Sequence, residues 1–128
     1  MILIPKEFED KIEGAFYAYF YHIPTEVTIS GVIYCINHTT GTRPLAWVRK
    51  VLLITSDTEN SANWLRIAEQ IFLCNDELLR RFILRRYGLR EKVEDTCYEL
   101  GFEKSAYYRY KTGLIYSFAL KAAAMGLG

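Results

Sequence analysis

The chain has 128 residues, of which 51% are hydrophobic and 24% are charged, and its formal net charge is +1. This length and composition bound it to one modest globular domain with room for an extended arm. No stretch approaches the roughly 18 apolar residues of a membrane span, and the start lacks the basic region and cleavage site of a signal peptide, so we expect a cytoplasmic protein without membrane contact.

The first predicted helix covers residues 6–22. Pro5 suits the first turn of a helix, and apolar side chains from Phe8 to Phe20 recur at helical spacing until Pro24 ends the pattern. The aromatic run 16–21 spreads around nearly the whole circumference of this helix, which is more than one core face requires. Two explanations stay open: packing against a second chain, and enclosure of the helix by its own fold.

Residues 25–37 are rich in β-branched side chains and have the propensity of a strand. Nothing nearby offers such a strand a clear partner, and an isolated strand is improbable in a helical protein. We therefore expect a helix or an irregular segment here. Residues 37–42 have the composition of a loop.

A helical apolar pattern follows Pro44 and continues from Leu45 to Phe72 in steps of three and four residues. It predicts either one long helix of about eight turns or two helices that the polar run 55–61 separates. In the second arrangement Asn60 or Ser61 caps the second helix.

The next predicted helix ends at Gly88 and begins at Asn75-Asp-Glu, which matches a cap followed by acidic residues that suit the helix dipole. Its expected buried side consists of Leu78, Leu79, Phe82, Ile83 and Tyr87. Four arginines occupy the remainder, either as a solvated face or as contacts to DNA phosphates. They are Arg80, Arg81, Arg85 and Arg86.

Residues 92–109 predict a helix, a turn that starts with glycine, and a second helix that opens at Lys104 or Ser105. This is the layout of a helix-turn-helix DNA reader. Its core combines one face of the first helix, the glycine that ends that helix in a left-handed conformation, and a tyrosine on the inner side of the second. These residues are Val93, Cys97, Leu100, Gly101 and Tyr107.

The outer face of the second helix carries polar side chains in the turns that enter a major groove when such a helix docks. Arginine pairs bidentately with guanine, and hydroxyl groups bond bases or phosphates. This face contains Ser105, Tyr108, Arg109 and Thr112, with Lys111 nearby. Residues 74–128 contain ten Lys and Arg against seven Asp and Glu, and no acidic residue follows Lys104, so the second helix is locally cationic.

The acid-capped helix that ends in Arg86-Tyr-Gly88, the short linker after it and the run Ser105-Ala-Tyr-Tyr-Arg-Tyr110 resemble the fourth region of bacterial sigma factors. They resemble more closely the small phage regulators of the RinA and ArpU type, which are late-gene transcriptional activators of phages and prophages in low-GC Gram-positive bacteria. The resemblance covers about residues 60–128 and includes Asn63-Trp-Leu-Arg-Ile-Ala-Glu-Gln-Ile71 and the tail from Lys121 to Leu127.

The resemblance implies an all-α protein with a sigma-region-4-like helix-turn-helix DNA-binding domain at residues 61–128. Residues 1–60 would form an N-terminal helical extension for oligomerisation or partner contact. It also implies a sequence-specific transcriptional regulator in the cytoplasm of a bacterial host cell, with double-stranded DNA and RNA polymerase as partners. If the aromatic helix 6–22 packs against a second chain, the protein would be a homodimer. By position, the residues facing the DNA would be Glu103, Lys104, Ser105, Tyr108, Arg109 and Thr112, with Lys92 beside them.

The chain departs from this pattern in two ways. The first motif helix and the residue before it carry four acids, which are unfavourable near DNA phosphates. They are Glu91, Glu94, Asp95 and Glu99. In addition, Cys97 replaces the commoner alanine.

Other functions stay open beside DNA reading. One is a DNA-packaging protein like a phage small terminase, which assembles into rings; another is a helical module that binds proteins only. We expect no enzyme and no cofactor, because the sequence has no Ser/His/Asp set, glycine-rich phosphate loop or metal-ligand spacing around His22 and His38. Three cysteines without CxxC spacing are expected to be reduced, buried thiols. They are Cys35, Cys74 and Cys97.

Overall fold

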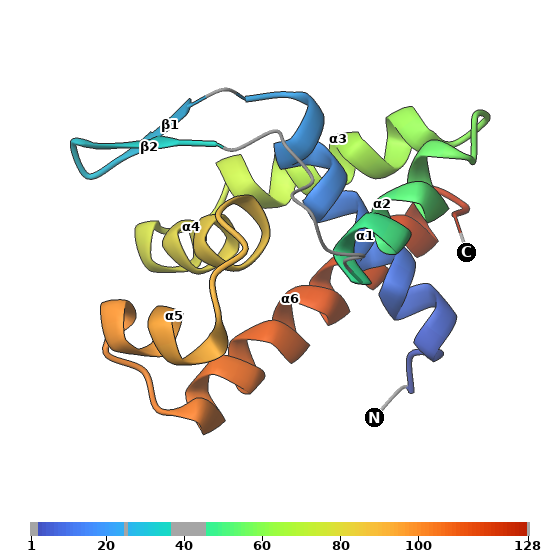
Figure 1. Ribbon diagram of the computed structural model, residues 1–128. Helices are drawn as coiled ribbons and strands as arrows, with labels where there is room; N and C mark the ends of the chain where they lie inside the picture. Colours follow the sequence, from blue (N-terminus) through green and yellow to red (C-terminus); the bar gives the residue numbers. More distant parts are fainter. Residues whose placement is uncertain (1–2, 25, 37–45, 128) are drawn as a thin grey trace.

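The computed structural model describes residues 3–24, 26–36 and 46–127 (Figure 1). This part of the chain forms six α-helices, a short π-helix and one antiparallel β-hairpin, so the fold is all-α as predicted. In chain order the elements are α1 Lys6–His22, β1 Glu26–Ile29, β2 Val32–Cys35, α2 Ala46–Thr55, α3 Ser61–Leu73, α4 Glu77–Ile83, η1 Leu84–Gly88, α5 Val93–Leu100 and α6 Lys104–Ala124.

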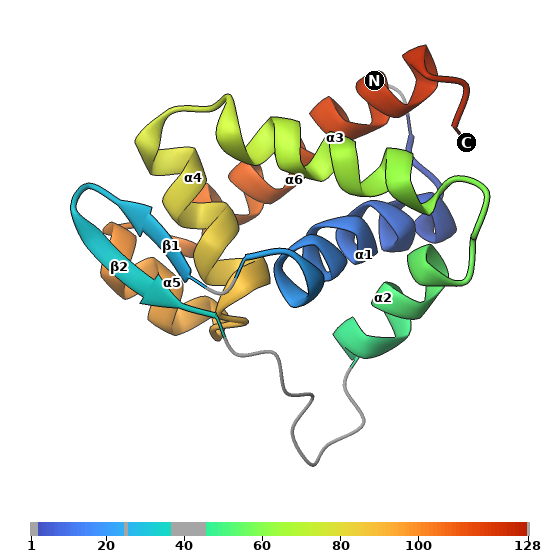
Figure 2. The same cartoon turned by 90° about the horizontal axis from the view of Figure 1, so that it is seen from above.

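Helix α1 lies in the middle of the molecule and contacts α2, α3, η1 and α6 (Figure 2). Its side chains Ile12, Phe16 and Phe20 are 0% exposed. Phe16 stacks on Tyr87 at 5.0 Å between ring centroids and meets Phe118 edge-on at 5.4 Å. The aromatic run 16–21 is therefore enclosed by its own fold, which was one of the two explanations.

Gly14 sets the close approach of α1 and α2. A Cβ atom at this position would lie 2.1 Å from the carbonyl oxygen of Lys50 and 3.2 Å from the Ile54 side chain. The two helices thus touch backbone to backbone at their crossing, where only glycine fits.

Residues 26–35 form a β-hairpin, so the prediction of a helix or irregular segment was wrong. β1 pairs with β2 from Glu26 opposite Cys35 to Ile29 opposite Val32. Ser30 and Gly31 connect the strands with φ angles of 56° and 77°, as a two-residue type I′ turn requires. The segment contains both pairing strands. The prediction was wrong because it treated residues 25–37 as one continuous element.

The apolar pattern from residue 46 to residue 73 is divided into α2 and α3, which confirms the two-helix alternative. Asp57 organises the connection, because its Oδ1 accepts a hydrogen bond from the Asn60 N–H (3.2 Å) and its carbonyl oxygen accepts one from Ser61 (2.8 Å). Asn60 stands at the N-cap of α3 without a side-chain cap bond. The predicted helix start at Pro44 and the loop at 37–42 lie outside the described residues, as does His38.

Helix α4 begins close to the predicted start, but its N-cap is Asp76 and not Asn75. The Asp76 Oδ1 accepts a hydrogen bond from the Leu79 N–H at 2.9 Å. It continues into η1, where the Leu89 N–H bonds the carbonyl of Leu84 at 2.8 Å across a widened turn. Gly88 ends this segment against Phe20, as predicted. Leu78, which was expected to be buried, is 36% exposed.

The hydrophobic core is continuous from Ile12 in α1 to Leu127 beyond α6. Phe118 of α6 illustrates this continuity, since it packs on Phe16 of α1 and stacks on Trp64 of α3 at 5.6 Å. The predicted division into an extension (1–60) and a DNA-binding domain (61–128) does not match this packing. Residues of α1 form the centre of the core that the second half uses.

Candidate functional site

The two helices predicted at residues 92–109 are α5 and α6. Gly101 ends α5 in a left-handed conformation, with φ 68° and ψ 31°, as its position predicted. The Phe102 N–H then donates to the carbonyl of Cys97 at 2.9 Å, which closes the turn. Lys104 is the first residue of α6, so three residues join the helices.

Helices α4, α5 and α6 pack around a shared aromatic cluster. Tyr107 is 0% exposed and meets the Phe82 ring edge-on at 5.1 Å. Phe102 stacks on Tyr110 at 4.9 Å, so the turn between α5 and α6 is anchored on α6 itself. Cys97 is buried at the same junction, and Val93 and Leu100 pack against it partly buried. The five predicted core residues therefore lie where the two helices meet.

Most of the predicted DNA-contacting residues are exposed on this unit. Side chains three and four residues apart on α6 share a face. The exposed members are Lys92, Glu103, Lys104, Ser105, Tyr108, Arg109 and Thr112. Tyr108 is 49% exposed although it belongs to the first turns of α6. We call this set the α6 outer face.

Lys111 does not belong to the α6 outer face. Its side chain is only 22% exposed, and its Nζ lies 3.8 Å from the Oε1 of Glu9 on α1. Position 111 follows the buried Tyr107 by four residues, so helical geometry directs its side chain toward α1. The prediction that Lys111 contacts DNA is not compatible with this placement.

The four arginines of α4 and η1 divide into two pairs. Arg80 and Arg81 are partly exposed on α4, and the Arg80 guanidinium lies 4.9 Å from the centroid of Phe72. Arg85 and Arg86 face inward: Arg85 Nη1 bonds Glu91 at 2.8 Å, and Arg86 Nη2 bonds Glu13 at 2.6 Å. Because both are held by internal carboxylates, the prediction that they contact phosphates is wrong for Arg85 and Arg86.

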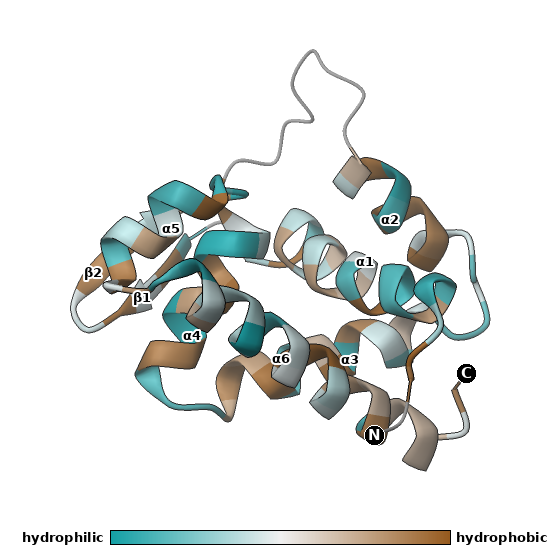
Figure 3. Cartoon of the chain, turned by 90° about the horizontal axis from the view of Figure 1, so that it is seen from below, coloured by the Kyte–Doolittle hydropathy of each residue, from teal (hydrophilic) through white to brown (hydrophobic). Residues whose placement is uncertain are grey.

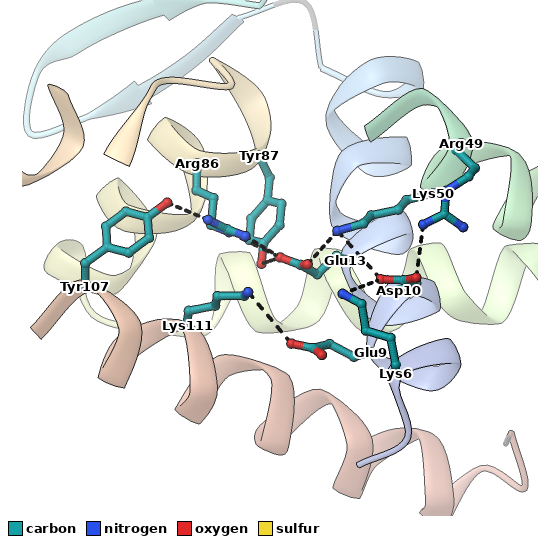
Figure 4. A network of polar contacts seen from close by, with 10 residues as sticks. All are labelled: Lys6, Glu9, Asp10, Glu13, Arg49, Lys50, Arg86, Tyr87, Tyr107 and Lys111. Carbon is teal, nitrogen blue, oxygen red and sulfur yellow. Dashed lines mark hydrogen bonds and ion pairs between the residues drawn. The ribbon is translucent and has the colours of Figure 1, made fainter. Parts of the chain in front are cut away.

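A buried polar network centres on Glu13, whose side chain is 1% exposed (Figure 4). Its Oε2 accepts hydrogen bonds from Arg86 and from the Tyr87 hydroxyl at 2.9 Å, and its Oε1 accepts one from Lys50 at 2.9 Å. Arg86 Nη1 donates to the Tyr107 hydroxyl at 2.6 Å. One carboxylate thus connects α1 and α2 to η1 and, through Arg86, to the start of α6.

Asp10 extends this network toward solvent. Its carboxylate lies 3.1 Å from Lys6, 3.1 Å from Arg49 and 3.7 Å from Lys50. Lys50 therefore stands between the two carboxylates of α1. The bridges to Lys6 and Arg49 are largely exposed and contribute less than the buried ones.

The surroundings of Glu13 keep it charged. Burial alone would raise the pKa of this carboxyl, but the charge of Arg86 and the hydrogen bonds from Lys50 and Arg86 outweigh burial and lower the pKa to about 2. Burial raises the pKa of Tyr17 to about 12 and the pKa of Tyr87 well above its usual value. The network consequently consists of fixed charges and neutral hydroxyl groups near neutral pH.

Sequence reasoning missed this network although the pattern contained a signal. Glu13 precedes Phe16 by three residues and Tyr17 by four, within the apolar stripe of α1. Arg86 follows Phe82 by four residues, within the apolar stripe that continues from α4 into η1. A carboxylate and a guanidinium that each interrupt an apolar stripe are costly unless they pair, so their pairing could have been predicted.

The outward side of α5 is acidic. Glu94, Asp95 and Glu99 are exposed, and Tyr98 between them is 85% exposed. Lys104 lies 3.6 Å from Glu94, which offsets one of these charges, and Arg85 lies 3.8 Å from Glu99. The α6 outer face therefore borders a surface of opposite sign.

Within the described residues, no group of three or more His, Cys, Asp or Glu side chains is arranged to hold a metal ion. Cys97 is buried and free as predicted, but Cys35 and Cys74 are exposed, which corrects the expectation of three buried thiols. His22 is exposed at the end of α1. None of the described helices is long and apolar enough to cross a membrane. Comparison with protein-family models, with curated proteins and with solved structures finds no match for this chain.

Proposed function

We propose that this protein is a sequence-specific DNA-binding transcriptional regulator that uses α5 and α6 as a helix-turn-helix. The observation that carries the proposal is the pairing of a rigid motif core with an exposed, polar first half of α6. Tyr107 anchors α6 from within, while Ser105, Arg109 and Thr112 stay accessible on its other side. A docked helix needs both properties, because base contacts require a fixed helix and unpaired side chains.

In this proposal α6 enters the major groove with the α6 outer face toward the bases. Arg109 is the strongest candidate for a base contact, since its guanidinium can bond guanine bidentately. Tyr108, Ser105 and Thr112 supply hydroxyl groups for bases or phosphates. Lys92 and Lys104 flank the helix start as phosphate contacts, and Arg80 and Arg81 are the remaining arginines of α4 that could reach the backbone.

The finer proposal is a late-gene activator of a phage or prophage, acting with RNA polymerase in the cytoplasm of its bacterial host. It rests on the resemblance of residues 60–128 to the RinA and ArpU regulators. The acidic side of α5 is unfavourable for contact with DNA phosphates but suits a protein partner. It favours, as a second candidate, a function through protein contact alone.

The test is selection from a random double-stranded DNA library at about 50 and 200 mM salt, followed by affinity measurements on the selected site. A reader enriches one sequence and loses affinity steeply with salt. Arg109→Ala should weaken binding to that site by about 1–3 kcal/mol. The matched control is Arg66→Ala, which removes an exposed arginine from α3 and should leave the affinity unchanged.

A chain that enriches no sequence at either salt concentration is not a DNA reader, and retained binding to RNA polymerase would then favour the protein-contact candidate. Equal affinity of Arg109→Ala and the unchanged chain would remove Arg109 from the reading surface. A large closed ring in solution would favour the DNA-packaging alternative over a regulator.

A further inference from the structure

A groove of about 750 Å³ runs along one side of α6, between that helix, the end of α3 and the start of α4. Its apolar lining comes from Ile71, Leu79, Tyr110 and Leu114. Figure 3 shows hydrophobic stretches at the end of α3 and at the start of α4. Leu73 and Leu78, which flank the same segment, are 54% and 36% exposed. We call this feature the α6 groove.

Gly113 helps to keep the α6 groove open. It lies in the interior of the 21-residue helix α6, where glycine is about 1 kcal/mol less favourable than alanine. Its φ is not left-handed, and a Cβ atom at this position would meet nothing within 4 Å. Neither the backbone conformation nor packing against the described part of the chain therefore requires glycine here. The absent side chain leaves space that a second helix can approach closely.

The α6 groove is also positively charged. Among the described residues that line it, Arg109 and Lys121 are the charged ones, and none is an aspartate or glutamate. These two residues are twelve positions apart on α6, which corresponds to about 18 Å along the helix axis. An apolar floor between two cations suits a short acidic helix that presents one large apolar side chain.

The outward side of α5 has this chemistry. Tyr98 is 85% exposed and is surrounded by the exposed acids Glu94, Asp95 and Glu99. The helix has eight residues and is about 12 Å long, so it fits between the two cations of the groove. Within one molecule α5 packs against α6, Cys97 is buried and Tyr98 stays in solvent, so the α6 groove of its own chain does not receive the Tyr98 side chain.

We propose that the acidic side of α5 from one copy of this chain docks into the α6 groove of a second copy. Tyr98 packs against Leu79 and Leu114 at the position that Gly113 leaves open, and Asp95 or Glu99 approaches Lys121. The two surfaces differ, so each docked copy still presents a free groove or a free α5. Such a heterologous contact repeats head to tail and gives open chains that lengthen with protein concentration, instead of a closed two-fold dimer or a closed ring of fixed mass.

This inference does not depend on DNA binding, because the contact requires only protein. It also gives a role to the acidic side of α5, which is unfavourable for contact with DNA phosphates. Arg109 belongs to the α6 outer face and also lines the α6 groove. For this reason the test leaves Arg109 unchanged and alters residues that lie outside the proposed DNA-reading surface.

The first experiment measures molecular mass by analytical ultracentrifugation over a protein concentration series at low and high salt. The groove variant Gly113→Leu fills the α6 groove; the knob variant combines Tyr98→Ala with Asp95→Asn. The mass of the unchanged chain should rise with concentration beyond that of a dimer, and less so at high salt. Each variant should associate at least about tenfold more weakly, as loss of a central tyrosine contact does.

Mixing the two variants provides the decisive comparison. The groove variant retains an intact α5 and the knob variant retains an intact groove, so one contact forms between them. The mixture should stop at a one-to-one heterodimer. The control Ala123→Leu adds the same side chain at an exposed position of α6 outside the groove and should associate like the unchanged chain.

Cysteine alkylation provides a second, local measurement. Cys74 lines the α6 groove, whereas Cys35 is exposed on β2 and serves as an internal control. The alkylation rate of Cys74 with iodoacetamide should fall as protein concentration rises, while that of Cys35 stays constant. The proposal is overturned by a chain that stays monomeric, by a mixture that does not form the heterodimer, or by association without protection of Cys74.

Discussion

At the scale of single residues, Glu13 is the side chain on which the interior depends most. Replacing it by glutamine in Glu13→Gln leaves the Arg86 guanidinium buried without a counter-charge. Removing one partner of a buried ion pair typically costs about 3–5 kcal/mol, so we expect a loss near the lower value, since the amide can still accept one hydrogen bond. Urea unfolding followed by circular dichroism measures the change.

The matched control for this substitution is Glu94→Gln, which removes a carboxylate of the same size from the exposed side of α5. Its contact to Lys104 at 3.6 Å is solvent-exposed on both sides, so no measurable loss of stability is expected. Equal unfolding midpoints for the two variants would contradict the central place of Glu13.

The lowered pKa of Glu13 also gives the folded state a pH dependence. Because the pKa is about 2 in the folded protein and near its usual value of 4.5 in the unfolded chain, the unfolded state binds the proton first. The stabilisation is complete above about pH 4.5 and is lost as the pH falls toward 2. Unfolding free energies measured between pH 6 and pH 2.5 should therefore fall more steeply for the unchanged chain than for Glu13→Gln.

Residue-level predictions from the sequence succeeded where local geometry alone decides the outcome. Gly101 was placed correctly because a left-handed helix end depends on a few neighbouring residues, whereas the predicted N-cap of α4, Asn75, lies one residue before the observed one, Asp76. Arg85, Arg86 and Lys111 were misplaced because long cationic side chains were assumed to face solvent. Arg86 and Lys111 meet Glu13 and Glu9 of α1, which only tertiary packing brings near them. Arg85 is held instead by Glu91, six residues further along the chain.

At the scale of elements, glycine decides which helix pairs can touch. Gly14→Ala places a methyl group 2.1 Å from the Lys50 carbonyl and must separate α1 from α2. Overpacking of this kind costs about 1–3 kcal/mol, which exceeds the gain in helix propensity. Gly113→Ala is the matched control in open space and should stabilise α6 by up to about 1 kcal/mol. Thermal unfolding should show a lower midpoint for Gly14→Ala and a higher midpoint for Gly113→Ala than for the unchanged chain. A higher midpoint for Gly14→Ala would refute the close crossing of α1 and α2.

The positions of α1, α3, α5 and α6 followed from apolar periodicity because each helix is amphipathic or aromatic over several turns. The hairpin did not, since residues 26–35 form one β-branched run that Ser30-Gly31 interrupts only briefly. The Ser-Gly pair is a known turn signal, but it is weaker than Asn-Gly in selecting the type I′ turn. A strand can be predicted from sequence only together with the strand that pairs with it, and here both strands lay within the same β-branched segment.

At the scale of the whole molecule, the central position of α1 determines what can fold alone. A fragment of residues 61–128 would expose Trp64, Tyr87 and Phe118, which α1 covers in the complete chain. We expect this fragment to lose the cooperative unfolding transition of the full-length protein, as seen by near-ultraviolet circular dichroism during urea titration. A sharp transition in the isolated fragment would restore the division at residue 60 that the sequence had indicated.

The overall class could be predicted from composition and periodicity, whereas the arrangement of the two halves could not. The resemblance covers about residues 60–128 and treats everything before them as an addition. The burial of the first helix does not fit this description of an addition, because Ile12, Phe16 and Phe20 are fully enclosed. Which helix becomes central depends on contacts far apart in the chain, and these leave no local pattern.

The stacking of Trp64 on Phe118 gives the protein an optical probe of its own. Trp64 is 2% exposed and joins α3 to α6, whereas Trp47 lies near Tyr17 and under the Arg90 guanidinium at 4.2 Å. The two indoles therefore report on different helix contacts. With Trp47 replaced by phenylalanine, the emission maximum of the remaining indole follows the α3–α6 contact directly. Any ligand that shifts α6 along α3 would then become visible by fluorescence without a label.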